Sequence, residues 1–218
     1  MYFTLSEKNA VVTATGSRGS VALKSGDTLD LTALCEGTDD TITLRARSGS
    51  MQAEKRVTFL RYDNVSTMFL VSDDPVNEGR EWVESSEDKS NRAKGSMALL
   101  AADGESVYDG KLTQIKGRGN STWKGAKRPY QIKLDKKTDL LQTGDSADKA
   151  KTWVLLANFY DPSAVRNMLA LDLGRALQME CNMGYRPVCL FYDGEFRGLY
   201  LLTEKVEVNE GRVNAVSY

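Results

Sequence analysis

The 218-residue sequence contains no histidine. A Ser-His-Asp triad, a Cys-His pair and a His-ligated zinc site are therefore excluded within this chain. Lys and Arg together number 29 and Asp and Glu 30, so the chain lacks the basic excess that dedicated nucleic-acid binders carry. It also lacks a run of about 18 apolar residues, which predicts that no helix spans a membrane. The remaining composition, 41% hydrophobic and 27% charged, is that of an ordinary globular protein.

Cysteine is scarce as well. Cys35, Cys181 and Cys189 show no CxxC spacing and are too few for a disulfide framework. We interpret them as small buried hydrophobic residues in preference to one bridge and one free thiol. They leave the cellular compartment open.

The first 61 residues predict an all-β module. Short segments rich in Val, Thr, Leu and Ile are separated by glycines, and residues 28–34 alternate cleanly between apolar and polar side chains. The expected strands cover 10–15, 20–24, 28–34, 41–46 and 56–60. This spacing is typical of a small immunoglobulin-like sandwich, and no charge cluster or aromatic platform marks a binding site there.

Residues 62–218 predict a second domain of the α+β class. Strand patterns recur at 66–71, 96–101, 111–116 and 129–134, whereas 73–95 has the composition of a polar loop. Two further strands, 186–192 and 199–206, flank the turn residues Asp193 and Gly194, which favour a hairpin.

One long helix is expected between these strands. Asp161 is a good N-cap, and Pro162 suits the first helical position. The apolar residues that follow share one face at helical spacing: Val165, Met168, Leu169, Leu173, Ala176 and Leu177. The expected fold is an antiparallel sheet with this helix packed on one side.

The stretch KGRGNSTW at 116–123 has the features of an anion-binding loop. Gly117 and Gly119 allow close approach of the backbone to a ligand, and Arg118 offers a planar fork for phosphate. Asn120 adds a neutral hydrogen-bonding side chain. An ordinary turn has the same pattern, so the stretch alone decides nothing.

The stretch KRPYQIKL at 127–134 predicts an amphipathic strand. Tyr130, Ile132 and Leu134 share one face, and Gln131 and Lys133 share the other. A lysine on a strand beside a glycine loop is how kinases hold nucleotide phosphates, although Lys133 also fits a plain solvent-facing position. Eight basic residues within 116–137 would equally suit a nucleic-acid binder with Trp123 and Tyr130 as stacking platforms.

Four ordered motifs together resemble one family. KGRGNSTW (116–123), KRPYQIKL (127–134), WVLLANFYDPSAVRN (153–167) and FYDGEFRGLYLLTEKV (191–206) are similar to the CotH family, the spore-coat-protein-H-type atypical protein kinases. The resemblance covers about residues 65–218. It implies a kinase N-lobe-like fold and transfer of phosphate from ATP, with Mg²⁺, to Ser or Thr of a protein.

The resemblance also implies roles for individual residues. The loop over the phosphates would consist of Gly117, Arg118, Gly119 and Asn120. Lys133 would be the strand lysine that binds them, and Glu204 would be a hinge residue at the end of the last strand. Kinases pair that lysine with a helix glutamate. The expected helix has none between Asp161 and Met179, and Asp172 and Glu180 remain two alternatives.

The family's catalytic and metal-binding aspartates are expected beyond the hinge, in a second lobe. Residues 62–218 suffice for only one lobe, so we assign no catalytic residue and no metal ligand within this chain and expect it to be inactive alone. The alternative is a non-catalytic surface-binding, adhesion or spore-coat-like structural protein. The family implies a nucleotide and a protein substrate as partners, at the surface or spore coat of a bacterium.

Overall fold

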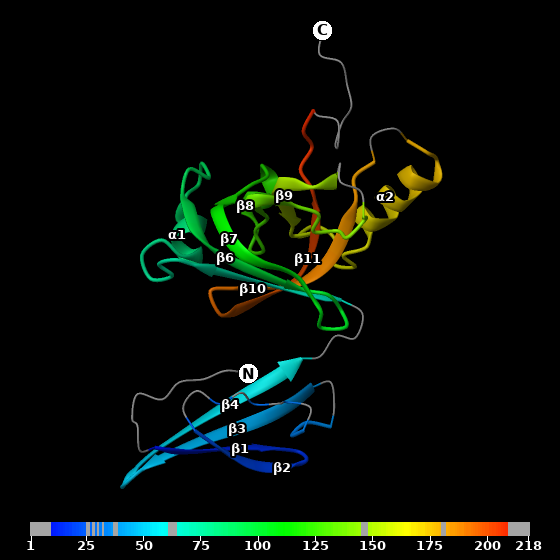
Figure 1. Ribbon diagram of the computed structural model, residues 1–218. Helices are drawn as coiled ribbons and strands as arrows, with labels where there is room; N and C mark the ends of the chain where they lie inside the picture. The colour runs from blue at the N-terminus through cyan, green and yellow to red at the C-terminus, as the bar shows by residue number, and fades with distance from the viewer. Residues whose placement is uncertain are drawn as a thin grey trace. The chain divides into compact units, whose positions relative to one another are not determined.

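The computed structural model describes residues 10–24, 27, 29, 31, 33–36, 39–60, 65–144, 148–179 and 182–208. The chain forms two compact units, Met1–Tyr62 and Asp63–Tyr218 (Figure 1). The break expected near residues 61–66 falls mostly outside the described residues. Each unit has its own hydrophobic core.

The first unit is an antiparallel sheet in the order β2-β1-β3-β4. Its strands are β1 (Val11–Gly16), β2 (Gly19–Leu23), β3 (Asp39–Ser48) and β4 (Met51–Leu60). The buried side chains that form its core are Val12, Ala14, Leu23, Leu29, Leu34 and Ile42.

The predicted immunoglobulin-like sandwich is wrong for the described part of this unit, which holds one sheet and no second layer. Residues 28, 30 and 32 of the strand expected at 28–34 lie outside the described residues. The described residues there form a turn, because the backbone N–H groups of Leu34 and Cys35 both donate to the Leu31 carbonyl. Leu29 and Leu34 therefore belong to a segment that connects β2 and β3, and their side chains are buried in the core of this unit.

The second unit is a closed seven-stranded barrel in the order β10-β11-β9-β8-β7-β6-β5 (Figure 1). Neighbours pair antiparallel except β10 and β5, which pair in parallel, with Val188 opposite Ser66, and so close the ring. The strands are β5 (Ser66–Ser72), β6 (Arg92–Leu100), β7 (Ser106–Gly117), β8 (Tyr130–Thr138), β9 (Ala150–Leu156), β10 (Tyr185–Tyr192) and β11 (Glu195–Glu204).

Side chains fill the barrel, because every second residue of each strand points inward. On β8 the inward set is Tyr130, Ile132 and Leu134, all fully buried, as the alternation predicts. Trp153 and Leu155 of β9 are fully buried in the same core. The outward residues of β8 and β9 are therefore the ones available to a ligand.

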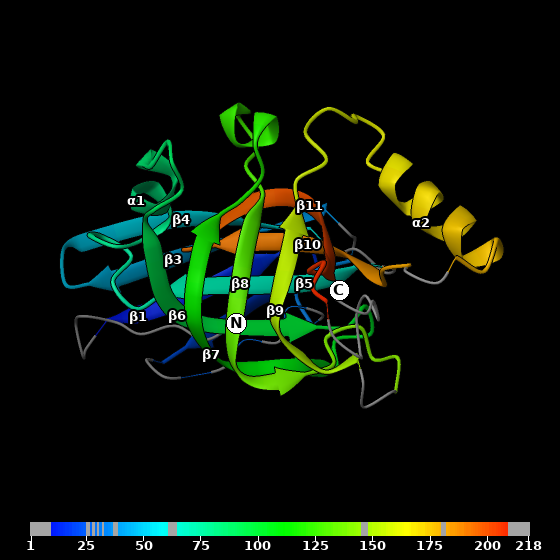
Figure 2. The ribbon, with the colours of Figure 1, turned by 90° about the horizontal axis from the view of Figure 1, so that it is seen from above.

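This barrel contradicts the predicted kinase N-lobe-like α+β fold, in which an open sheet packs against a long helix. The main helix, α2 (Arg166–Ala176), has only 11 residues and stands away from the barrel (Figure 2). Leu169 and Leu173, expected to pack on the sheet, are 63% and 59% exposed. A closed barrel buries its inner face with its own side chains, so it needs no helix to cover a sheet.

The helix also begins later than predicted. Ala164 has a positive φ of 58°, which no α-helix accommodates, and its N–H donates to the Asp161 carbonyl in a tight turn. The Asp161 carboxylate accepts hydrogen bonds from the N–H groups of Ser163 and Arg166, at 3.2 and 2.8 Å. Asp161 thus stabilises the turn before α2 and accepts the N–H of the helix's first residue, whereas the N-cap position is occupied by Val165.

A short helix, α1 (Arg80–Ser85), lies in the stretch 73–95 that predicts a polar loop. Val83 is fully buried and Trp82 packs against the barrel core, so two apolar residues are enough to dock it. The predicted hairpin is confirmed: β10 and β11 join through Asp193 and Gly194, both with positive φ. The described helices include none long and apolar enough to cross a membrane.

Candidate functional site

The glycine loop between β7 and β8, residues 117–129, requires glycine at two positions, at Gly119 for its backbone conformation and at Gly117 for lack of space. Gly119 has φ +82°, and an added Cβ would lie 2.3 Å from Thr122 Oγ1. At Gly117 an added Cβ would lie 2.2 Å from the Trp123 ring. The Arg118 N–H donates to the Pro129 carbonyl at 3.2 Å and closes the loop.

Contacts to α1 and β11 hold this loop in place. The Trp123 indole N–H donates to the Ser86 carbonyl at 2.9 Å, and the Arg128 guanidinium lies 4.9 Å from the indole ring. Tyr200 donates its hydroxyl to the Arg128 carbonyl at 2.9 Å, while the Lys127 ammonium donates to the carbonyl of Leu199. The loop therefore has a fixed position relative to the barrel wall.

These contacts also remove the basis for a nucleic-acid site at 116–137. Trp123 is 3% exposed and Tyr130 is fully buried, so neither ring can stack on a base. Both rings instead pack edge to face, with centroids 6.5 Å apart.

Two cavities lie beside the glycine loop on the outer face of the barrel. The first, of about 300 Å³, is lined by the loop, the end of β9 and the turn before α2. The second, of about 200 Å³, lies over β8 and β9 and the end of β11. Arg118 and Leu156 line both, so the two cavities adjoin at these side chains, and together they are called the cleft below. The smaller volume alone is below the range of ligand pockets, whereas the larger lies at its lower limit.

Arg118 occupies the middle of this cleft. Its side chain is half-buried, and burial lowers the pKa of the guanidinium below its usual value. Among the described residues no carboxylate lies within ion-pair distance of Arg118. A partly desolvated cation without a counter-charge favours an anionic ligand.

The turn between β9 and α2 forms one end of the cleft. Asn158, with φ 50°, donates from its amide to the Ala164 carbonyl and accepts from the Asn167 amide at 2.7 Å. The Tyr160 hydroxyl donates to the Ser121 carbonyl at 3.2 Å and so joins this turn to the glycine loop. The hydrogen bonds from Ser163 and then Arg166 lower the pKa of Asp161.

The end of β11 forms the other end. Thr203, Glu204 and Lys205 line the second cavity together with Val154 and Met183. The Glu204 carboxylate is buried and accepts the Gly184 N–H at 2.7 Å. The structure thus brings Arg118 and Glu204, two of the residues singled out in the sequence, to one cleft.

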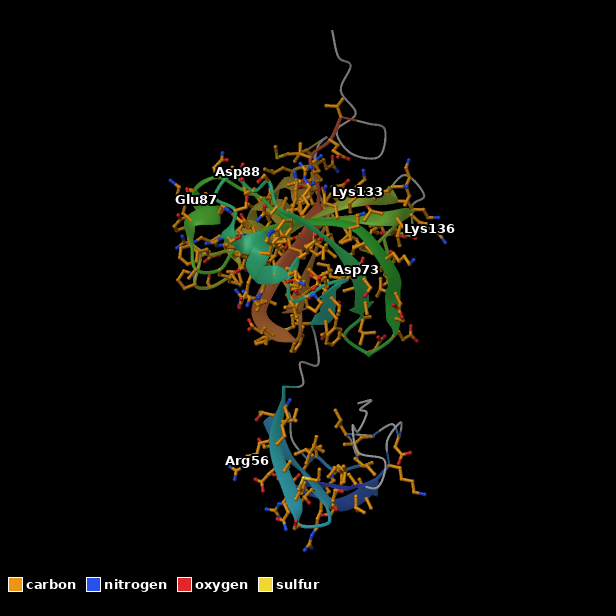
Figure 3. All side chains as sticks on the ribbon, turned by 90° about the vertical axis from the view of Figure 1, so that its left-hand side faces the viewer. Arg56, Asp73, Glu87, Asp88, Lys133 and Lys136 are labelled. Carbon is orange, nitrogen blue, oxygen red and sulfur yellow. The ribbon has the colours of Figure 1, made fainter. Side chains whose placement is uncertain are left out.

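Lys133 lies apart from them. It is exposed on the outer face of β8, and it lines neither cavity, although its neighbour on that face, Gln131, lines the second. Figure 3 places Lys133 toward Lys136, away from Glu87 and Asp88. Of its two suggested acidic partners, Asp172 is bound to Arg175 and to the Tyr185 hydroxyl, and Glu180 lies outside the described residues.

Gly117, Gly119 and Asn120 are next to Arg118 in the chain, but none of the three lines either cavity; Asn120 is exposed before the short 3₁₀ helix at Ser121–Lys124. The sequence argument missed Asn158, Arg166 and Asn167, which line the larger cavity. All three lie within the 153–167 motif, and membership of that motif was the one feature of the sequence that could have indicated them. In the described part of the chain no three Cys, Asp or Glu side chains gather as metal ligands.

Residues 115–217 match the family described as CotH kinase protein. The matched stretch includes the whole glycine-loop motif, the strands that line the two cavities, α2 and the β10–β11 hairpin. Over these residues it confirms the resemblance noted in the sequence. No curated protein matches the chain.

Proposed function

Because residues 115–217 match the family described as CotH kinase protein, we propose that the cleft beside the glycine loop binds ATP for transfer of phosphate to Ser or Thr of a protein. The observation that carries this proposal is Arg118, a half-buried cation that lines both cavities and has no carboxylate of the described residues within ion-pair distance. Arginine binds phosphate through two parallel hydrogen bonds, so its position between the cavities suits a nucleotide that occupies both.

The loop glycines contribute by shaping the loop. The space that a side chain would take is filled at Gly117 by the Trp123 ring and at Gly119 by Thr122, and this close packing sets the path of the backbone around Arg118. We assign the base to the strand end at Thr203–Lys205, which lines the second cavity. Mg²⁺ would accompany the phosphates, and we assign it no protein ligand because the described residues gather none.

We expect these 218 residues to bind nucleotide without transferring phosphate. Both carboxylates that line the cleft are already engaged, Asp161 with Ser163 and Arg166 and Glu204 with Gly184. Neither is free to position an acceptor hydroxyl, which phosphoryl transfer requires. The alternative, a non-catalytic binding or structural protein, predicts no nucleotide binding at all.

The test is titration of the isotopically labelled chain with ATP, followed by amide NMR. We expect shifts at residues 117–120 and 203–206 and a dissociation constant in the millimolar range, about −4 kcal/mol. Replacing Arg118→Gln should weaken binding roughly ten-fold. An unperturbed cleft at saturating ATP, or shifts confined to other surfaces, would contradict the proposal. Labelling of the chain or of a protein acceptor by radioactive ATP would contradict the expected inactivity.

A further inference from the structure

The two ends of the cleft differ in chemistry. At the β11 end the lining includes Val154, Met183 and Val206, which suit the faces of a flat apolar ring. At the α2 end it includes Asn158, Arg166 and Asn167, which are hydrogen-bonding side chains. Arg118 lies between the two ends because it lines both cavities. A ligand with an apolar ring at one end and negative charge at the other therefore has one favoured orientation.

Arg166 supplies a second cation at the polar end. Its Nε lies 3.7 Å from Asp161 Oδ1, and its side chain is 78% exposed. The Asp161 carboxylate already accepts hydrogen bonds from Ser163 and from the backbone of Arg166. Asp161 therefore holds the arginine near the cavity but leaves most of its five donors available.

The charge at this end is unbalanced. Among the described residues that line the larger cavity, two are cations, Arg118 and Arg166, and one is a carboxylate, Asp161. Two arginines that line one cavity, one from the glycine loop and one from the start of α2, suit a polyphosphate better than a single carboxylate, because each guanidinium can form a bidentate pair with a phosphate group.

Lys133 lies away from the α2 end of the cleft. It pairs across the strands with Thr152, whereas the larger cavity begins at Leu156. Four residues of extended strand span roughly 13 Å. The strand lysine is thus displaced from the polar end, along β9, by about that length.

We propose that Arg166, together with Arg118, binds the β- and γ-phosphates, with the base at the 203–206 end, and that Lys133 takes no part in phosphate binding. This inference rests on the proposed nucleotide-binding function and assigns the orientation of the ligand and a binding residue that the glycine-loop pattern does not reveal. Asn158 and Asn167 position that end by their mutual hydrogen bond.

The experiment compares Arg166→Gln with Arg175→Gln in the full chain. Arg175 is a matched control, because it lies on the same helix, is ion-paired with Asp172 and lines neither cavity. Dissociation constants are measured by NMR for ATP, inorganic tripolyphosphate and adenosine. We expect Arg166→Gln to weaken ATP and tripolyphosphate roughly five- to ten-fold and to leave adenosine unchanged, with Arg175→Gln and Lys133→Gln close to the parent chain.

The outcomes separate this inference from the proposed function. Equal ATP affinities for Arg166→Gln and Arg175→Gln, while Arg118→Gln remains weakened, would overturn the role of Arg166 alone. A loss for Lys133→Gln as large as that for Arg166→Gln would overturn the orientation. Absence of ATP binding by the parent chain would overturn the proposed function itself. Circular dichroism of each variant confirms that the fold is retained.

Discussion

The indole N–H of Trp123 donates a 2.9 Å hydrogen bond to the carbonyl of Ser86, and this bond joins the glycine loop to the segment that follows α1. The two residues come from parts of the chain that the sequence presents as unrelated. Around them, Arg128 lies over the indole and donates to the Glu84 carbonyl. The position of Arg118, and with it the cleft, depends on this anchoring.

Trp123→Phe should therefore destabilise the chain and weaken the cleft. The substitution leaves the buried Ser86 carbonyl without its donor, which costs about 1–3 kcal/mol. Urea unfolding measures the loss of stability, and ATP titration measures the effect on the cleft. Trp123→Phe with unchanged stability and unchanged ATP affinity would show that the loop is held by other contacts.

Gly117→Ala should displace the same ring. The added methyl would lie 2.2 Å from the indole, so the ring or the loop must move, at a cost of about 1–3 kcal/mol. The control is Gly104→Ala, where an added Cβ meets nothing within 4 Å and only the strain of φ +90° remains. Amide NMR of residues 117–120 should change in Gly117→Ala and not in Gly104→Ala. Identical loop spectra in both variants would contradict the close contact.

Local patterns predicted the strands better than the way they assemble. The alternation of Tyr130, Ile132 and Leu134 and the turn at Asp193-Gly194 are written in neighbouring residues, and the structure agrees with both. Closure of the barrel depends on pairing β10 with β5, far apart in the sequence, which periodicity does not encode. An open α+β sheet was predicted because a helical pattern follows the strands, and no local pattern indicates that β10 pairs with β5.

The candidate site divides in the same way. The glycines and Arg118 were found because a glycine loop has a recognisable composition, whereas Arg166 and Asn158 carry no pattern of their own. Their place in the cleft comes from the turn at Ala164, whose positive φ delays the helix. The capping signals of Asp161 and Pro162 placed the helix start too early, and helical periodicity assigned the apolar residues of α2 to a core that the barrel fills with its own side chains.

Apolar residues on α2 should contribute little to stability. Leu173→Ser should change the free energy of unfolding by less than about 0.5 kcal/mol, because the side chain is 59% exposed. Leu155→Ala, inside the barrel, should cost about 2–5 kcal/mol. Thermal or urea unfolding compares the two. A loss above 2 kcal/mol for Leu173→Ser would mean that α2 packs on a core after all.

Protonation of the Asp88 carboxylate should lower the free energy of unfolding at acid pH. It accepts hydrogen bonds from the Ser86 hydroxyl at 2.6 Å and the Ser90 N–H at 3.0 Å, which lower the pKa of Asp88 from its usual 3.8 to about 2. A depressed pKa means that folding favours the ionised form. Its contribution to stability is therefore complete above about pH 4 and is lost as the pH falls toward 2.

Asp88→Asn should accordingly be less stable than the parent at neutral pH, and the difference should shrink between pH 4 and 2. Glu87→Gln is the control, since this neighbouring carboxylate is exposed and makes neither bond (Figure 3). Carboxyl NMR of Asp88 follows its titration directly, and urea unfolding at several pH values follows stability. Because Ser86 also accepts the Trp123 indole through its carbonyl, protonating Asp88 should loosen the glycine-loop anchor and broaden the Trp123 indole resonance over the same interval. A titration midpoint near the usual value, or an indole signal unchanged down to pH 2, would contradict this coupling.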